Sequence, residues 1–130
     1  MADTPATFEL DTTYLHLDED AEVATMAVGD DFWATIDQRS ELERGRLVGL
    51  FHYDADWPTW EMHPAGDEVV YLLSGAVDLV LDEAGTERVV ALRARTAFVV
   101  PRGVWHTARV GEAGAALHIT AGAGTQVRPA

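Results

Sequence analysis

Two short segments of the chain combine histidines and carboxylates at spacings that could bind a metal ion. Glu61 and His63 are two residues apart, and because side chains alternate between the faces of a strand, we expect both to point the same way. A Pro-Ala-Gly turn follows, and Glu68 beyond it can return its carboxylate to the same point. His106 comes shortly after a second turn that contains proline and glycine. Two imidazoles with one or two carboxylates are a suitable ligand set for a divalent ion.

The elements that would position these residues are short β-strands. From residue 46 onward, runs rich in valine, leucine and aromatic residues alternate with turn signals. We expect strands at 46–53, 59–63, 68–73, 76–82, 86–92, 97–100, 104–110 and 115–120, a turn at 111–114, and a C-terminal tail from residue 122. Strands of this number and spacing are typical of a β-sandwich or barrel, and a jelly roll is one common solution.

Residues 1–45 are less regular, and we assign them to an N-terminal extension of the same single domain, with the barrel at 46–130. Strands are expected at 12–17 and 24–28, and a short helix near Phe32, capped by Asp30 or Asp31. This section contains apolar residues without a clear place in a barrel. We therefore predict a homodimer in which it covers or extends the partner's sheet, because an unpaired sheet edge invites pairing.

The first of the two segments resembles a characteristic motif of the cupin superfamily. That motif is a His, any residue, a second His, three or four residues, a Glu, six residues and a Gly. His63, Glu68 and Gly75 match it, and Glu61 stands where the first His of the family usually stands.

The second segment resembles the other cupin motif, which is Pro, any residue, Gly, two residues, His, three residues and Asn. Pro101, Gly103 and His106 match it; Val110 replaces the Asn, and Arg95 occupies a preceding Gly position. With its strand pattern, the resemblance extends over roughly residues 46–120. It implies an all-β fold, the cupin-type antiparallel jelly-roll β-barrel, also called a double-stranded β-helix.

The resemblance implies one divalent metal ion per chain, with His63, Glu68 and His106 as ligands. Glu61 is expected as a fourth ligand, and the alternatives are a supporting residue or a general base. Two carboxylates make a harder, more anionic site than three histidines with one glutamate, which favours Fe(II) or Mn(II) natively. Zn(II) or Ni(II) could occupy the site in purified protein, because affinity rises along the Irving–Williams series.

For small cupins the resemblance implies metal-dependent enzymes of small molecules, such as dioxygenases, isomerases, epimerases, decarboxylases and lyases. The candidates for moving protons are Glu61, His52 and Tyr53. The alternative is a non-catalytic sensor or small-ligand-binding protein, although the sequence contains no helix-turn-helix. His16, His52 and His118 lie outside the motifs and are expected to be structural or surface residues. Of these, His52 and His118 lie on strands that should line or flank the barrel, so either could contact the pocket.

The amino-acid composition limits which binding partners and which cellular compartment we expect. The formal net charge is −13, from 22 acidic residues and nine arginines, without lysine. Such a surface repels nucleic-acid phosphates and anionic lipid head groups, so neither nucleic acid nor membrane is expected as a partner. The absence of cysteine excludes disulfides and zinc-thiolate sites. Without a signal peptide or an apolar stretch near the roughly 20 residues of a membrane span, we expect a cytoplasmic protein.

Overall fold

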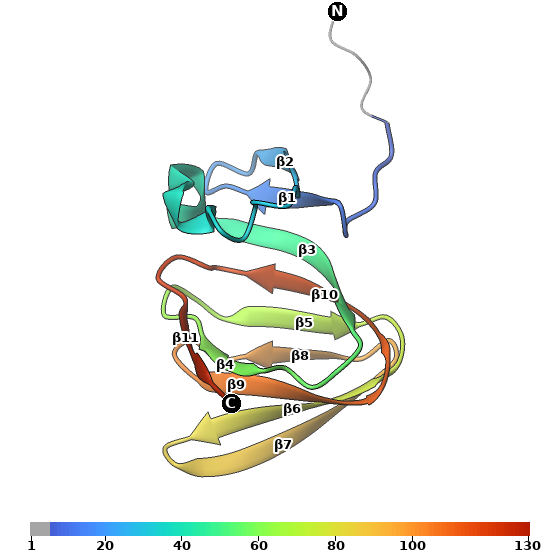
Figure 1. Cartoon of the computed structure of the whole chain (residues 1–130). Helices are drawn as coiled ribbons and strands as arrows, with labels where there is room; N and C mark the ends of the chain where they lie inside the picture. Colours follow the sequence, from blue (N-terminus) through green and yellow to red (C-terminus); the bar gives the residue numbers. More distant parts are fainter. Residues whose placement is uncertain (1–5) are drawn as a thin grey trace, which may run out of the picture.

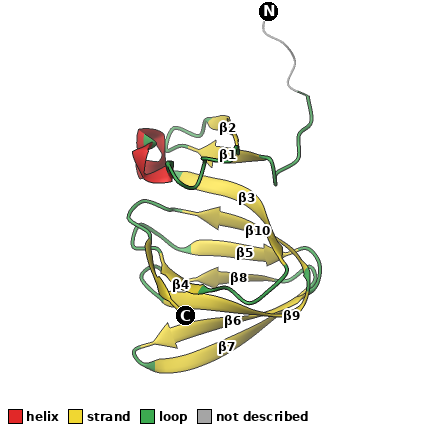
Figure 2. Ribbon diagram, viewed as in Figure 1, coloured by secondary structure: helices red, strands yellow, loops and turns green. Residues whose placement is uncertain are grey.

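The computed structural model describes residues 6–130 and folds them into two antiparallel β-sheets that face each other (Figures 1 and 2). The six-stranded sheet has the order β2-β1-β3-β10-β5-β8, and the five-stranded sheet has the order β11-β4-β9-β6-β7. The strands are β1 (Thr13–Leu17), β2 (Val23–Ala27), β3 (Arg46–Tyr53), β4 (Thr59–Met62), β5 (Glu68–Leu72), β6 (Ala76–Glu83), β7 (Thr86–Arg93), β8 (Ala97–Val100), β9 (Trp105–Glu112), β10 (Gly114–Thr120) and β11 (Gln126–Pro129).

The core lies between the two sheets because alternate residues of each strand point inward. Strand β5 shows this alternation clearly, since Glu68, Val70 and Leu72 are buried while the residues between them are half-buried. The main apolar cluster joins residues of both sheets, among them Leu72 from β5 and Leu79 from β6. Glu68 is therefore a carboxylate on the inward face of a strand that otherwise contributes apolar side chains to the core.

All eight strands expected from residue 46 onward are present, and their ends differ from the prediction by two residues or fewer. The jelly-roll prediction is thereby confirmed. The turn expected at 111–114 is wrong in extent, because β9 continues to Glu112 and β10 begins at Gly114. Gly75 explains the close approach there: its φ is +87°, and a Cβ would lie 2.6 Å from the carbonyl oxygen of Glu112. The expected C-terminal tail contains a further strand, β11, which pairs with β4.

The N-terminal section extends the chain's own six-stranded sheet. Strand β1 pairs with β2 on one side and with β3 on the other. The helix expected near Phe32 is replaced by turns and two short 3-10 helices, η1 (Ile36–Gln38) and η2 (Ser40–Glu43). Phe32 is fully buried against Tyr14, which fixes the turn segment by packing rather than by helix propensity. The domain boundary at residue 45 and the homodimer stay predictions; residues 1–5 lie outside the described part of the chain.

Among residues 6–130, no helix has the length and apolar character that crossing a membrane would require.

Candidate metal centre

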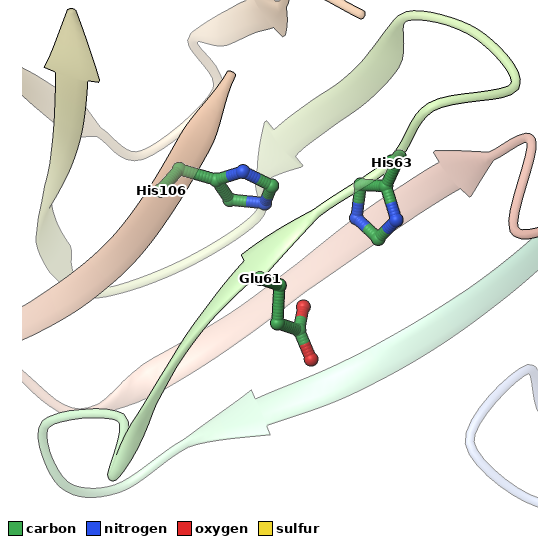
Figure 3. Close-up of side chains that lie close together, drawn as sticks. All are labelled: Glu61, His63 and His106. Atoms are coloured by element: carbon green, nitrogen blue, oxygen red, sulfur yellow. The ribbon is translucent and has the colours of Figure 1, made fainter. Parts of the chain in front are cut away.

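Strands β4, β5 and β9 contribute the predicted metal ligands, and Figure 3 shows three of them, Glu61, His63 and His106, lying close together. Glu61 lies on β4 and His63 follows the end of that strand, so the two side chains share a face. Glu61 pairs in register with His106 on the neighbouring strand β9. A carboxylate oxygen of Glu61 and one ring nitrogen each of His63 and His106 all lie within 4.8 Å of one another. The local sequence alternation thus produces the predicted juxtaposition.

Glu68 places a second carboxylate against both imidazoles. Its Oε2 lies 3.4 Å from Nε2 of His63, and its Oε1 lies 3.2 Å from Nε2 of His106. Two ligands of one ion, each at about 2.1 Å from it, lie roughly 3.0–3.4 Å apart in octahedral or tetrahedral geometry. The separations of these donor atoms therefore suit a shared ion. All three side chains are buried.

The hydrogen bonds of the two imidazoles leave both Nε2 atoms free to coordinate. Nδ1 of His106 lies 3.1 Å from the carbonyl oxygen of Val104, which can only accept, so Nδ1 carries the proton. Nδ1 of His63 lies 2.8 Å from the hydroxyl of Thr125, and that hydroxyl gives its own proton to the carbonyl of Gly122. In the neutral imidazole, each Nε2 then presents a lone pair.

Three buried atoms at this centre have unmet hydrogen-bonding capacity: Nε2 of His63, Nε2 of His106 and Oε1 of Glu68 have no hydrogen-bond partner among the described residues. Buried polar atoms without partners are uncommon in folded proteins because each costs free energy. Lone pairs of two imidazoles and a carboxylate that face one another would repel. A cation between them removes both problems, so the residues present fit a divalent ion.

The charges at the centre influence each other's pKa values. Burial acts against ionisation of Glu68, but the neighbouring imidazoles of His106, His118 and His63 outweigh it and hold the pKa of that carboxyl well below its usual range. Burial also acts against a charged His106, yet the Glu68 carboxylate beside it raises the pKa of this imidazole. The centre therefore contains an ionised carboxylate and attracts positive charge, either a proton or a metal ion.

A second layer of polar side chains orients Glu68. Its Oε2 accepts a 2.5 Å hydrogen bond from the hydroxyl of Thr120 and lies 3.3 Å from Nδ1 of His118. Nε2 of His118 lies 2.5 Å from the hydroxyl of Tyr53. Since a carboxylate only accepts, Nδ1 of His118 donates to Glu68 and its Nε2 accepts from Tyr53. These contacts orient the carboxylate so that Oε1 is directed at His106.

The three proton-transfer candidates have different surroundings. The imidazole of His52 is exposed, lies 3.4 Å from a carboxylate oxygen of Asp11, and belongs to the lining of the pocket that also contains Tyr53 and Glu61. Burial raises the pKa of Tyr53 far above its usual value, and the nearby carboxylates of Glu68 and Glu61 raise it further. Tyr53 therefore serves as a hydrogen-bond donor rather than as a base. Glu61 is the one candidate of the three whose side chain lies beside both histidines of the centre.

Sequence reasoning missed part of the polar layer around the predicted ligands. His118 and Thr120 are two residues apart on β10 and so share a face, which was the signal available for their joint contact with Glu68. Thr125 gave no signal, because it lies in a loop that reaches His63 only through the pairing of β11 with β4.

The centre lies in a pocket with a volume of about 860 Å³. Glu61, His63 and Glu68 belong to its lining, and Trp33, Phe51 and Trp57 contribute aromatic surface. A pocket of this size, largely apolar with a few convergent polar groups, is typical of a small-molecule site.

Comparison with known proteins yields one family match. The cupin-domain family model matches residues 49–122, more than half of the chain. No curated protein matches the chain.

Several solved structures are similar to this chain at low sequence identity. A cupin-2 domain protein from Shewanella frigidimarina is 22% identical over 57% of this chain and 68% of that chain, with a TM-score of 0.50. Oxalate oxidase in complex with the substrate analogue glycolate is 19% identical over 62% and 45%, with a TM-score of 0.51. Co(II) HppE in complex with substrate is 14% identical over 63% and 48%, with a TM-score of 0.52. At these identities the likeness concerns the fold.

Proposed function

Since this chain belongs to the cupin family, we propose that it binds one divalent metal ion and uses it to act on a small molecule. The ligands would be His63, Glu68 and His106, with Glu61 as the fourth. The observation that supports this set is the convergence of three buried atoms without hydrogen-bond partners, Nε2 of both histidines and Oε1 of Glu68. Each histidine also directs its Nδ1 proton at an oxygen acceptor, as metal-binding histidines usually do.

The donor set favours particular ions. Two imidazoles and two carboxylates are harder ligands than three imidazoles with one carboxylate, and they contain no sulfur. The native ion in this proposal is Fe(II) or Mn(II), whereas Zn(II) or Ni(II) can replace it during overexpression. Cupin-fold structures with Fe(II) and Co(II) HppE show that this fold accommodates such ions in another protein.

The reaction class that suits the site is that of an oxygenase or of an isomerase or lyase. When bound, the ion would supply a Lewis acid for a substrate oxygen or a binding position for O₂. Glu68 is held ionised and oriented by Thr120 and His118. Glu61 is half-buried beside His63 and His106, so its carboxylate is placed to bind the ion or to accept a substrate proton.

A second candidate function is a non-catalytic sensor or small-ligand-binding protein. The observation in its favour is that two of the three proton-transfer candidates are poorly suited to that role. His52 lies beside Asp11. The hydroxyl of Tyr53 is hydrogen-bonded to His118, and the pKa of Tyr53 is raised. A pocket with a metal ion and few groups for proton transfer would serve ligand recognition as well.

Metal analysis of protein purified anaerobically without chelator tests the metal site. We expect close to one divalent ion per chain, and a large loss of metal in His63→Ala with His106→Ala. The matched control is His52→Ala, which removes an exposed histidine outside the centre and should keep the metal. Equal metal content in wild type and the double variant would contradict the proposed ligands. O₂ uptake with a small-molecule screen then distinguishes an oxygenase from a binding protein.

A further inference from the structure

Three arginines belong to the exposed and half-buried part of the pocket lining at residues 36–46, which we call the mouth. Arg39, Arg44 and Arg46 all line the pocket that contains the metal centre. They are a third of the nine arginines in a sequence with 22 acidic residues. Two carboxylates, Asp37 and Glu43, line the same mouth, so three guanidiniums against two carboxylates give it a formal charge of +1, whereas the whole chain has −13.

These three arginines have no carboxylate partner within the described residues, whereas four other arginines do. Ion pairs with acidic side chains involve Arg88, Arg93, Arg109 and Arg128. Asp37 and Glu43 line the same mouth, yet neither forms an ion pair with an arginine. The guanidinium charge at the mouth is therefore available to a ligand.

Arg39 is held in place by packing. Its guanidinium carbon lies 4.7 Å from the centroid of the Phe32 ring, which is fully buried. Its Nε is shielded from solvent and has no hydrogen-bond partner among residues 6–130, so a ligand would meet the terminal nitrogens of this guanidinium rather than its Nε. A guanidinium fixed by stacking, with hydrogen-bonding capacity left over, is suited to bind an oxyanion with little loss of conformational entropy.

The segment that carries Arg44 and Arg46 is also fixed. Nε2 of His16, a buried residue of β1, donates a 2.7 Å hydrogen bond to the carbonyl oxygen of Arg44. Gly45 has a φ of +72°, and a Cβ there would clash with the carbonyl oxygen of Leu17. This turn therefore holds two cationic side chains at the pocket edge.

An apolar wall connects the arginines with the metal centre. The ring of Phe32, on which Arg39 stacks, is 5.1 Å from the ring of Trp33, and Trp33 is 5.8 Å from Phe51. Phe51 in turn is 5.0 Å from the imidazole of His118, which contacts Glu68. Trp33 is half exposed despite its size, as expected of an aromatic residue at a ligand site.

We infer that the pocket accepts an organic oxyanion whose charged group is bound by Arg39 at the mouth. The apolar body of such a ligand would lie against Trp33, Phe51 and Trp57, with its other end near Glu61. Arg44 and Arg46 raise the local concentration of anions at the opening. A carboxylate and a phosphonate share this chemistry. The inference rests on the proposed function for the site, because it names the class of small molecule that the site would take.

Binding of three probes with similar bodies tests the inference. Phenylacetate and phenylphosphonate are anionic, and phenylacetamide is neutral. Calorimetry on Mn(II)-loaded protein should give tighter binding of at least one anion than of the amide. In Arg39→Gln that anion should bind about tenfold more weakly, because a charged hydrogen bond is lost, while binding of the amide should stay unchanged. A preference for one anion over the other identifies a carboxylate or a phosphonate as the better ligand.

The matched control is Arg95→Gln. Arg95 is exposed, has no ion pair with a described residue and does not line the pocket. Its anion affinity should equal that of wild type, as should the melting temperature and metal content of all variants. Should Arg39→Gln unfold, Arg44→Gln with Arg46→Gln replaces it, and the expected result is a slower association of the anion that depends less on salt.

Metal-free protein separates failure of the inference from failure of the proposed metal site. Retention of the anion preference without metal, and its loss in Arg39→Gln, would support the inference even if the metal proposal fails. An anion preference that disappears without metal and survives in Arg39→Gln would overturn it, because the metal alone would then bind the anion. Equal affinity of wild type for all three probes, or no binding of either anion, would also overturn it.

Discussion

Nδ1 of His63 donates a 2.8 Å hydrogen bond to the hydroxyl oxygen of Thr125, a residue 62 positions further along the chain. Thr125 can only accept from His63, because it gives its single proton to the carbonyl oxygen of Gly122. The tautomer of a buried histidine is thus set by a loop next to the C-terminal strand. Only with the proton on Nδ1 does Nε2 present a lone pair to Glu68 and to a metal ion.

Thr125→Val should therefore weaken metal binding although it removes no ligand. The variant deprives Nδ1 of its acceptor, so the imidazole loses its fixed orientation and tautomer. Loss of such a supporting contact lowers metal affinity by about 10–100-fold. Competition titration with a fluorescent chelator measures the change.

The conservative variant Thr125→Ser keeps the hydroxyl and should bind metal like wild type. The same loss of affinity in both variants would contradict the role of the hydrogen bond, because Thr125→Ser keeps the hydroxyl. Unchanged affinity in Thr125→Val would contradict the role given to this residue.

Tyr53→Phe should destabilise the protein while leaving one metal per chain. The hydroxyl of Tyr53 is buried and donates to Nε2 of His118. Its removal leaves a buried nitrogen without a partner, at a cost of about 1–3 kcal/mol. Thermal unfolding of the metal-free protein measures this cost. A melting temperature equal to that of wild type would show that His118 finds another donor.

Much of the fold follows from residue patterns that act over short distances. The strands from β3 to β10 each combine β-branched or aromatic residues with a flanking turn, and such signals are contained within about ten residues. Strand β11 has no such run, since it contains Gln126, Arg128 and Pro129, and it exists through its pairing with β4. The 3-10 helices likewise depend on the burial of Phe32 against a distant strand.

Strand alternation and turn signals were enough to predict which residues form the candidate centre. Alternation placed Glu61 and His63 on one face, and the turn after them returned Glu68. The orientation of these ligands depends instead on Thr120 and Thr125, whose contacts with them span 52 and 62 positions. Contacts between residues so far apart in the sequence depend on the topology of the whole domain, so they cannot be predicted from a local pattern in a single sequence.

Acid should weaken the attachment of β11 before it weakens the core. Arg128 on β11 donates a 2.8 Å hydrogen bond to Asp82 of β6 and lies over the rings of Trp105 and Trp60. The hydrogen bond from Arg128 holds the pKa of the Asp82 carboxyl below its usual value of 3.8, and a backbone hydrogen bond from Gly85 adds to this. Because the pKa of Asp82 is lower in the folded protein, the contribution of its carboxylate to stability is complete above pH 3.8 and is lost as the pH falls below that value.

Hydrogen exchange of the β11 amides, followed from pH 6 downward and corrected for intrinsic rates, measures this effect. Protection of β11 should fall below pH 4 in wild type, and Asp82→Asn should have reduced protection that no longer changes in this range. Asp78→Asn is the control, because Asp78 lies on the same strand and its contact with Arg93 is longer and more exposed. Equal pH profiles for wild type and Asp82→Asn would contradict the prediction.

The homodimer remains a prediction, and the structure gives it a sharper test. Strand β2 is an outer strand of the six-stranded sheet, and the side chain of Val23 on it is 61% exposed. An outer strand with an exposed valine can pair with a second copy. Light scattering at tens of micromolar should give a dimer, and Val23→Asp should shift it toward monomer. Val89→Asp on β7, an outer strand of the other sheet, is the matched control. A wild-type monomer would refute the prediction.

Glu61 differs from the histidine that the cupin pattern has at its position, and its variants separate a ligand from a base. As a ligand, it would give the site a second negative charge that offsets the charge of the ion. A bound water would then be less acidic than at a site with three histidines. Glu61→Gln should lower metal affinity by about tenfold or more. Glu61→His should keep the metal and move the preference toward Ni(II), Cu(II) or Zn(II).

Competition titrations with Mn(II), Fe(II) and Zn(II) on wild type, Glu61→Gln and Glu61→His measure these preferences. The matched control is Glu112→Gln on β9, an exposed glutamate outside the centre, which should leave all affinities unchanged. The register of Glu61 with His106 and its position within 4.8 Å of both imidazole ligand atoms support a direct bond to the ion. Unchanged affinity in Glu61→Gln would exclude that bond. A loss of turnover on an identified substrate without a loss of metal would then make Glu61 the base, because only proton transfer would have been removed.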